Sequence, residues 1–378
     1  MPFSFEVLKT DPSGGRLGRM HTPHGAVDTP AFMPVGTAAS VKGMTQGALE
    51  ELGAQIFLCN TYHLYLRPGH ELIRNLGGLH RFMAWPRAIL TDSGGYQVFS
   101  LADLRKVTDE GVTFRSHLDG SEHLLTPEKA LEIQMALGPD IMMALDECIE
   151  HPASEERSRK AAARTLDWAR RSKQEFEAKL GAGGGASLAL FGIVQGGTFA
   201  GLRRQSAREL VELEFDGYAV GGLAVGEPHA LTCEMTAEVA PLLPAGKPRY
   251  LMGVGKPEDI PDYVQRGIDI MDCVLPTRSA RHACIFTSVG RVLIRQARYA
   301  DDARPLDEGC SCAVCERYSR AYVRHLFMAG EILGAVLATH HNIHFYLDLM
   351  GRIRHAIEFG DLAEFSSELR LRLAEDPG

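Results

Sequence analysis

The run LALFGIVQ, residues 188–195, is almost wholly apolar and lies between two segments with helical periodicity, 154–178 and 202–213. A strand with one face in water alternates apolar and polar residues, whereas a continuous apolar run is typical of a strand buried on both faces. Buried strands that alternate with amphipathic helices form parallel sheets covered by helices. This stretch therefore predicts an α/β fold.

Seven further short apolar runs of this kind occur along the chain. They are AFMPV (31–35), QIFLCN (55–60), AILTD (88–92), DIMMALD (140–146), GYAVG (217–221), RYLMG (249–253) and IDIMD (268–272). Helix-like segments such as 127–137 and 230–242 separate most of them. Eight such strands predict a closed (β/α)₈ TIM barrel. An open doubly wound sheet is the alternative, but no G-x-G-x-x-G sequence follows a strand to favour it.

Two segments interrupt the alternation of strands and helices. VTFRSHLDGSEHLL (112–125) predicts a β-hairpin with Asp-Gly at its turn, inserted between the third and fourth barrel strands. Residues 286–346 contain a cluster of cysteines, and we expect them to form a zinc-binding subdomain inserted near the C-terminus. The whole chain, 1–378, is otherwise expected to be a single TIM-barrel enzyme domain.

Composition and charge exclude some classes of protein. No stretch reaches the roughly 20 apolar residues of a membrane span, and the start lacks the features of a signal peptide, so we expect a cytoplasmic protein that does not enter membranes. The net charge of −8 argues against a general polyanion binder. Residues 277–325, however, hold nine arginines and five carboxylates, which suits contact with phosphates. A solvated face with structural ion pairs is the alternative.

The ends of the predicted strands carry the candidate chemistry. Asp92, Asp146 and Asp272 end three of them and Gln195 ends a fourth, with Gly-Gly pairs close by. TIM-barrel enzymes place their active sites at the carboxyl ends of the strands. A single strand-end aspartate is more often a helix cap, but three at one rim favour a site. Paired carboxylates suit reaction at a sugar anomeric carbon, while metal binding by them is less favoured because no histidine is near.

A second candidate site is the cysteine cluster, Cys310, Cys312 and Cys315. The C-x-C-x-x-C spacing supplies three thiolates, one ligand short of a closed tetrahedral zinc site. The segment THHNIHF (339–345), on a predicted helix, offers three histidines for the fourth position. Four protein ligands leave no open position, so we expect a structural zinc ion.

These residues together resemble a known family, the bacterial-type tRNA-guanine transglycosylases, also called queuine or pre-queuosine tRNA-ribosyltransferases. The similarity spans the chain and rests on TDSGGYQ (91–97), ALDE (144–147), GIVQGG (192–197), GGLAVGE (221–227), YLMGVGKPED (250–259), DCVLPTR (272–278) and the cysteine cluster. It implies exchange of guanine at the anticodon wobble position for 7-aminomethyl-7-deazaguanine in queuosine biosynthesis. The implied substrates are the GUN-anticodon tRNAs for Asp, Asn, His and Tyr, and the implied route is double displacement through a covalent tRNA-ribosyl aspartate.

The resemblance also implies roles for individual residues. Asp272 is the implied nucleophile and Asp92 the implied general acid/base. Asp146 would accept hydrogen bonds from the base, while Gln195 and the Gly222 amide would contact its carbonyl oxygen. The other implied base contacts are Ser93, Tyr96, the Leu223 carbonyl and Met252. The implied RNA contacts are Arg278 and Arg281, and the implied zinc ligands are Cys310, Cys312, Cys315 and His341.

Val225 and Cys148 are similar to the residues of members that take the small aminomethyl base. The resemblance further implies one structural zinc ion per subunit, the tRNA anticodon loop and a 7-deazaguanine base as partners, and a homodimer. Two alternatives stay open. A barrel glycoside or nucleoside hydrolase with two catalytic carboxylates would form product from water alone, and a non-enzymatic partner subunit would be expected to lack the strand-end aspartates.

Overall fold

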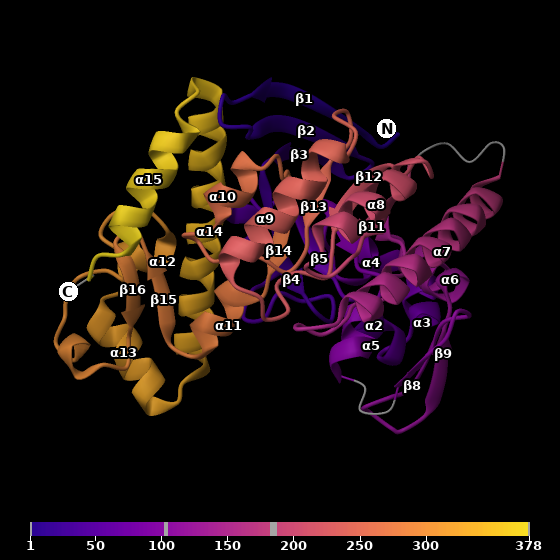
Figure 1. Ribbon diagram of the computed structural model, residues 1–378. Coiled ribbons are helices and arrows are strands. Elements are labelled where there is room, and N and C mark those ends of the chain that lie inside the picture. Colours follow the sequence, from indigo (N-terminus) through magenta and orange to yellow (C-terminus); the bar gives the residue numbers. More distant parts are fainter. Residues whose placement is uncertain (1, 102–104, 182–186, 377–378) are drawn as a thin grey trace.

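The structure, a computed structural model, describes residues 2–101, 105–181 and 187–376 (Figure 1). Its centre is a closed barrel of eight parallel strands, as predicted. In chain order they are β4 (Ala31–Gly36), β5 (Ile56–Cys59), β6 (Ala88–Thr91), β10 (Ile141–Met143), β11 (Ala189–Val194), β12 (Gly217–Val220), β13 (Arg249–Leu251) and β14 (Ile270–Cys273). Each lies within one of the eight apolar runs or extends it by one residue. The barrel closes where β14 pairs with β4, with Ile270 opposite Ala31.

Helices surround the barrel. The helices of the barrel part of the chain, ending with the helix directly after the last barrel strand, are α1 (Gln46–Glu51), α2 (Thr61–Leu66), α3 (His70–Asn75), α4 (Gly78–Phe82), α5 (Gly95–Leu101), α6 (Pro127–Leu137), α7 (Glu155–Leu180), α8 (Ala200–Val211), α9 (His229–Val239), the 3₁₀ turn η1 (Ala240–Leu242), α10 (Ile260–Gln265) and α11 (Leu275–Arg281). The bounds of α6 follow from its ends. Thr126 accepts a hydrogen bond from the Lys129 amide, Pro127 fits the first turn, and Gly138 ends the helix in the left-handed conformation.

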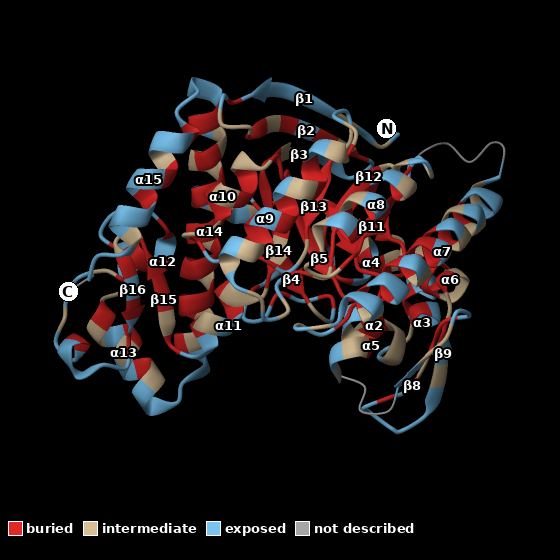
Figure 2. Ribbon diagram, in the orientation of Figure 1, coloured by how far each residue is buried: buried red, intermediate tan, exposed pale blue. Residues whose placement is uncertain are grey.

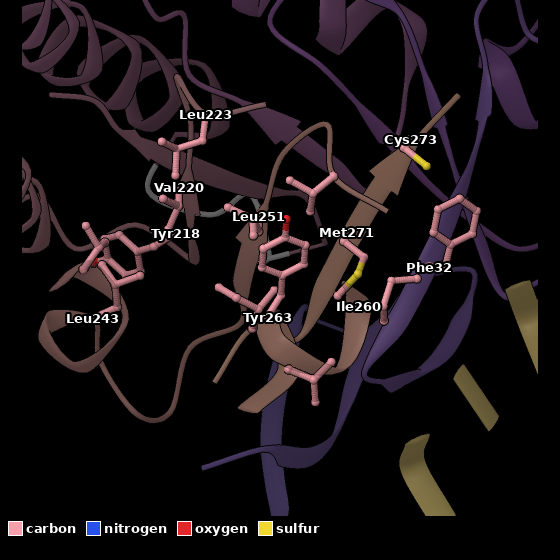
Figure 3. Close-up of a cluster of buried hydrophobic side chains, with 14 of the residues drawn as sticks. Phe32, Tyr218, Val220, Leu223, Leu243, Leu251, Ile260, Tyr263, Met271 and Cys273 are labelled. Carbon is pink, nitrogen blue, oxygen red and sulfur yellow. The ribbon is translucent and has the colours of Figure 1, made fainter. Parts of the chain in front are cut away.

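Strand residues of the barrel are buried on both faces (Figure 2). Side chains such as Met33 and Val35 point into one central cluster, while Phe32 packs in a second cluster between barrel and helices. This outer cluster includes Leu251, Met271 and Cys273 (Figure 3). Cys273, which follows Asp272 directly, is therefore a core residue.

A three-stranded antiparallel sheet, absent from the sequence-based prediction, covers one end of the barrel (Figure 1). Its strands are β1 (Ser4–Thr10), β2 (Arg16–Thr22) and β3 (Gly25–Thr29). Met20 and Val27 from this sheet belong to the central cluster of the barrel. The sheet thus closes the amino end of the barrel strands, and the carboxyl ends form the other mouth.

The predicted hairpin between the third and fourth barrel strands is confirmed. It consists of β8 (Val112–Arg115) and β9 (Glu122–Leu125), and a third short strand, β7 (Arg105–Val107), pairs with β8. Gly120 of the predicted Asp-Gly turn has a positive φ of 75°.

The chain after α11 forms a separate layer beside the barrel (Figure 1). It contains β15 (Cys284–Thr287), β16 (Gly290–Leu293), η2 (Ala297–Tyr299), α12 (Ala313–Arg317), α13 (Arg320–Ala329), α14 (Ile332–Phe359) and α15 (Leu362–Leu373). Buried side chains between Ala280 and Ala338 form a cluster of their own. Helix α14 contacts both β15 and the barrel strand β4, so it joins the two parts. The subdomain limits of 286–346 stay a prediction. Among the described helices, none has the length and apolar character to cross a bilayer.

Candidate active site

The carboxyl mouth of the barrel gathers the predicted site residues. Asp92 follows β6, Asp146 lies three residues past β10, and Gln195 follows β11 directly. Asp272 lies within β14, one residue before the strand ends. Parallel strands bring their carboxyl ends to one side, so these side chains, far apart in the sequence, meet at one place.

Asp92 is buried and held by four donors. Its Oδ1 accepts hydrogen bonds from the Thr61 amide (2.8 Å) and the Gly94 amide (3.2 Å). Its Oδ2 accepts from Asn60 Nδ2 (2.5 Å) and Gln97 Nε2 (2.7 Å). Burial raises the pKa of Asp92 to about 6 against these hydrogen bonds, and the charge on Asp272 adds to the rise. A carboxyl group with this pKa can both give and take a proton near neutral pH.

Asp146 is also buried. Its Oδ2 accepts a hydrogen bond from Gln195 Nε2 at 2.7 Å, and its Oδ1 accepts from Ser93 Oγ at 3.2 Å. Burial raises the pKa of Asp146 to about 6 as well, although both hydrogen bonds oppose the shift. Ser93, predicted as a base contact, thus positions Asp146.

Asp272 is half-buried and is held through one oxygen. Oδ1 accepts hydrogen bonds from the Tyr250 hydroxyl (2.5 Å) and the Gly253 amide (2.9 Å). Burial raises the pKa of Asp272, whereas these two bonds to the charged form lower it. Among the described residues, none donates a hydrogen bond to Oδ2.

Tyr250 was missed by sequence reasoning, which treated it only as a strand residue. Burial raises the pKa of the Tyr250 hydroxyl, and the charges of Asp272, Asp92 and Asp146 all add to this rise. Of the three aspartates, Asp272 is the one that hydrogen-bonds this hydroxyl group. Tyr250 belongs to the central cluster, so its side chain points into the barrel. This direction is the signal that would have identified Tyr250 as a site residue, and the local sequence pattern does not reveal it.

The loops after β11 and β12 meet beside Asp146. Gly222 has a φ of +63°, and a Cβ there would lie 2.1 Å from Gln195 Oε1, so only glycine allows this approach. Met252 Sδ lies 3.5 Å from the position of a Cβ on Gly221, which places the thioether next to this loop. The Leu223 side chain is buried in the outer cluster (Figure 3), and the contact of its carbonyl with the base stays a prediction.

Tyr96 and the arginines lie at the rim. Tyr96 is 48% exposed, although it follows the buried Asp92–Gly95 stretch. Burial raises the pKa of Tyr96, and the positive charge of Arg278 opposes this rise. Arg278 and Arg281 are both exposed on α11, directly after β14. At the far side, Arg291, Arg298, Arg304 and Arg320 form ion pairs with carboxylates. Structural ion pairs thus account for part of the basic segment.

The three cysteines and His341 also come together. Nδ1 of His341 lies 3.7 Å from Cys310 Sγ, 3.6 Å from Cys312 Sγ and 3.2 Å from Cys315 Sγ. Nε2 of His341 donates a hydrogen bond to the Phe286 carbonyl (2.7 Å), which directs the Nδ1 lone pair toward the sulfurs. Four soft and borderline donors, all within 4.8 Å of one another, fit a tetrahedral zinc ion. His344 Nδ1 lies 3.4 Å from Cys310 Sγ alone.

A closed parallel barrel with three aspartates at its carboxyl mouth defines a TIM-barrel enzyme. A family model described as queuine tRNA-ribosyltransferase matches residues 11–374. The chain is 59% identical to a queuine tRNA-ribosyltransferase from Koribacter versatilis over 96% of its length and 95% of that protein. A protein of the same name from Solibacter usitatus is 56% identical over 96% of this chain and 96% of that protein. Another from Pelotomaculum thermopropionicum is 56% identical over 97% of this chain and 98% of that protein. The chain belongs to the queuine tRNA-ribosyltransferase family and is a pentosyltransferase of the tRNA-guanine transglycosylase type.

Proposed function

We propose that the enzyme exchanges guanine at the wobble position of GUN-anticodon tRNAs for 7-aminomethyl-7-deazaguanine, by double displacement through a covalent ribosyl bond to Asp272. The observation that carries this proposal is the Asp272 carboxylate, held through Oδ1 by the Tyr250 hydroxyl and the Gly253 amide, at the same barrel mouth as the buried Asp92 and Asp146. Only Asp272 of the three is fixed through one carboxylate oxygen and half-exposed at the mouth. Oδ2 is then the attacking atom.

Recognition of the base falls to Asp146 and the loops around it. With a pKa of about 6, Asp146 is mostly ionised at neutral pH and can accept hydrogen bonds from N1–H and the amino group of a guanine. Gln195 Nε2 and the Gly222 amide would be the donors for the carbonyl oxygen, which is next to N1 on the same edge of the base. A base within folded RNA must be turned out and stacked before it reacts, and Tyr96 and Met252 supply the two faces.

The reaction itself uses Asp272 and Asp92. Oδ2 of Asp272 bonds to the ribose C1′ as the glycosidic bond to the base N9 breaks, and the electron pair stays with the base. Asp92 provides the proton that the leaving base takes up, and its pKa of about 6 suits this exchange. N9 of the second base then attacks C1′ and gives its proton to Asp92, while the bond from C1′ to Asp272 Oδ2 breaks and its electron pair returns to the carboxylate. Two displacements retain the configuration at the sugar.

The preference for the small aminomethyl base is proposed on the family resemblance, because Val225 and Cys148 are similar to the residues of members that take this base. Purified enzyme should therefore release labelled guanine from tRNA with 7-aminomethyl-7-deazaguanine and not with queuine. Equal release by both bases would contradict this choice.

The remaining partners are proposed on the family resemblance. The anticodon loop would lie over Arg278 and Arg281, and one structural zinc ion per subunit would join α12 to α14. We also propose a homodimer, which light scattering would detect as twice the chain mass, and a cytoplasmic location, where unmodified tRNA is found.

Incorporation of labelled guanine into unmodified tRNA tests the function. We expect the wild type to incorporate it and Asp272→Asn to lose activity while it still binds tRNA, because Asn lacks a nucleophilic carboxylate. Asp140→Asn, which removes a buried carboxylate at the amino end of β10, should keep activity as the control. Full activity of Asp272→Asn would exclude it as the nucleophile.

The hydrolase alternative predicts a different product. It would release guanine from tRNA without added base and leave an abasic ribose. A transferase instead accumulates a protein–tRNA adduct that survives denaturation, and this adduct should be absent from Asp272→Asn. The adduct accounts for one guanine per enzyme, so release of many guanines per enzyme without added base would overturn the proposed exchange.

A further inference from the structure

Arg203 is a buried cation that the proposed chemistry does not use. It lies in the first turn of α8, and its side chain is among the largest fully buried ones in the protein. Gly196 makes room for it, since a Cβ on Gly196 would lie 2.9 Å from Arg203 Cγ. The guanidinium group therefore lies directly beneath the loops that follow β11 and β12.

The guanidinium group bonds to backbone carbonyls alone. Nε donates to the Gly197 carbonyl at 2.6 Å, and Nη2 donates to the Gly221 and Gly222 carbonyls at 3.0 and 3.2 Å. Nη1 is buried and has no hydrogen-bond partner among the described residues.

No carboxylate in the described chain forms an ion pair with Arg203 within hydrogen-bond distance. Burial lowers its pKa to about 10, with Glu227 as the first charge that opposes the shift, so the group is still a cation at neutral pH. A buried cation without a paired anion costs several kcal/mol relative to a neutral side chain of similar shape. Anchoring two loops requires only neutral donors, so the charge itself calls for a separate explanation.

The bond to the Gly221 carbonyl supplies that explanation. The Gly221 C=O and the Gly222 N–H are the two ends of one peptide group. A cation at the oxygen end withdraws electrons from the group and makes the N–H a stronger donor. We propose that Arg203 is a positioning residue that polarises the Gly221–Gly222 peptide, so that the Gly222 N–H stabilises negative charge on the carbonyl oxygen of the departing base.

This inference rests on the proposed function, in which the Gly222 amide faces the base oxygen. When N9 leaves C1′, the electron pair of the broken bond enters the ring system, and part of the charge reaches that oxygen until Asp92 delivers a proton. A donor polarised in advance stabilises this developing charge more than it stabilises the neutral bound base. The arrangement therefore acts on the rate of bond cleavage more than on binding.

The test compares two free bases and two arginine variants. Guanine presents oxygen to the Gly222 amide, whereas 6-thioguanine keeps N1–H and the amino group but presents sulfur, a weak acceptor. We expect Arg203→Gln to weaken guanine binding by at most about twofold, from loss of a 10–30% strengthening of one hydrogen bond, and to change 6-thioguanine binding much less. Turnover with tRNA should fall more than guanine affinity, by about tenfold or more, with KM for tRNA nearly unchanged.

Arg204→Gln is the matched control, because Arg204 is the next residue of α8 and pairs with Glu238 at the protein surface. It should leave the preference for guanine over 6-thioguanine unchanged. Arg203→Lys keeps a cation, so its guanine affinity and its turnover with tRNA should lie between those of Arg203→Gln and the wild type. If Arg203→Gln does not fold, the same comparison of the two bases can be made with Arg203→Lys.

If Arg203→Gln and Arg203→Lys weaken the binding of guanine and of 6-thioguanine equally, the proposal is overturned and Arg203 is a loop anchor only. Unchanged affinity for both bases would have the same consequence. These results are distinct from failure of the proposed function. In that case the wild type itself would not incorporate labelled guanine, or Asp272→Asn would remain active.

Discussion

At the scale of single residues, two buried aspartates at opposite ends of the same strand have opposite electrostatic surroundings. Asp146, past the carboxyl end of β10, has a pKa raised to about 6 by burial. Asp140, just before the amino end of β10, is equally buried, yet hydrogen bonds from His80, His24 and the Ile89 amide lower its pKa despite that burial. The charged form of Asp146, at the mouth of the barrel, is thus destabilised by its surroundings. The charged form of Asp140 is stabilised, and it holds the closed end of the barrel together.

This contrast predicts opposite effects of the same substitution on stability. The folded-state pKa of Asp146 lies above the usual 3.8, so the folded protein loses stability as pH rises from about 4 to about 6 and remains less stable above that. Asp146→Asn should therefore raise the free energy of unfolding at pH 7 by about 2 kcal/mol, with no gain near pH 4, and should abolish base exchange. Urea unfolding at both pH values measures this.

Asp140→Asn is the control for that measurement. Because the pKa of Asp140 is lowered, its charge stabilises the fold at pH 7, and the variant should be less stable than the wild type there. A loss of stability at pH 7 in both variants would show that the Asp146 carboxylate is not strained in the free enzyme.

At the scale of elements, the loop after β12 depends on a glycine. An alanine at Gly222 would bear a left-handed φ, which costs about 1 kcal/mol, and its Cβ would displace the Gln195 amide. We expect Gly222→Ala to weaken guanine binding by about tenfold or more, from loss of the Gln195 contact. Gly330→Ala, at the end of α13, has a similar φ of +74° with nothing within 4 Å, so it should cost similar stability and leave binding unchanged. Equal affinities in the two variants would contradict a role for the Gln195–Gly222 approach.

The zinc cluster joins the loop before α12 to the middle of α14. Cys312→Ser should remove about one equivalent of zinc per chain by metal analysis, because only a thiolate completes the four-ligand set. Zinc present at a thousand times its dissociation constant contributes about 4 kcal/mol to folding, so the variant and chelator-treated wild type should unfold at lower temperature. Cys284→Ser, in the adjacent strand β15, should keep its metal. Retention of zinc by Cys312→Ser would exclude the cluster as the site.

At the scale of the whole molecule, an acidic protein must bind a polyanion. Helix α11, which carries Arg278 and Arg281, directly follows the last barrel strand and leads to the layer that carries the other arginines (Figure 1). It is therefore the part of the basic segment nearest the mouth. Several of the other arginines are already paired with carboxylates.

Salt dependence distinguishes phosphate contacts from these structural pairs. Arg278→Ala should weaken tRNA binding and reduce the slope of log affinity against log salt concentration by about 0.7 to 1. Arg208 lies on the outer helix α8, so Arg208→Ala should change neither the affinity for tRNA nor the slope of its salt dependence. An unchanged slope in Arg278→Ala would show that Arg278 does not contact a phosphate.

The sequence by itself determined the eight barrel strands, the strand-end aspartates and the crowded cysteines. Each of these is a local signal, because a strand buried on both faces must be apolar throughout and thiolate ligands from one loop must lie close in sequence. The sequence missed β1–β3, whose first strand is mostly exposed and carries no clear pattern.

Only the tertiary structure decided how distant groups act on each other. From the residues alone, three histidines were candidates for the fourth zinc ligand, and the rotation of α14 against Phe286 brings His341 to all three sulfurs. The Tyr250 hydroxyl on Asp272, the Arg203 cation behind Gly221 and the raised pKa values of Asp92 and Asp146 likewise arise from contacts between separate strands and helices. Burial and charge depend on every neighbour in space, so no local pattern of residues carries them.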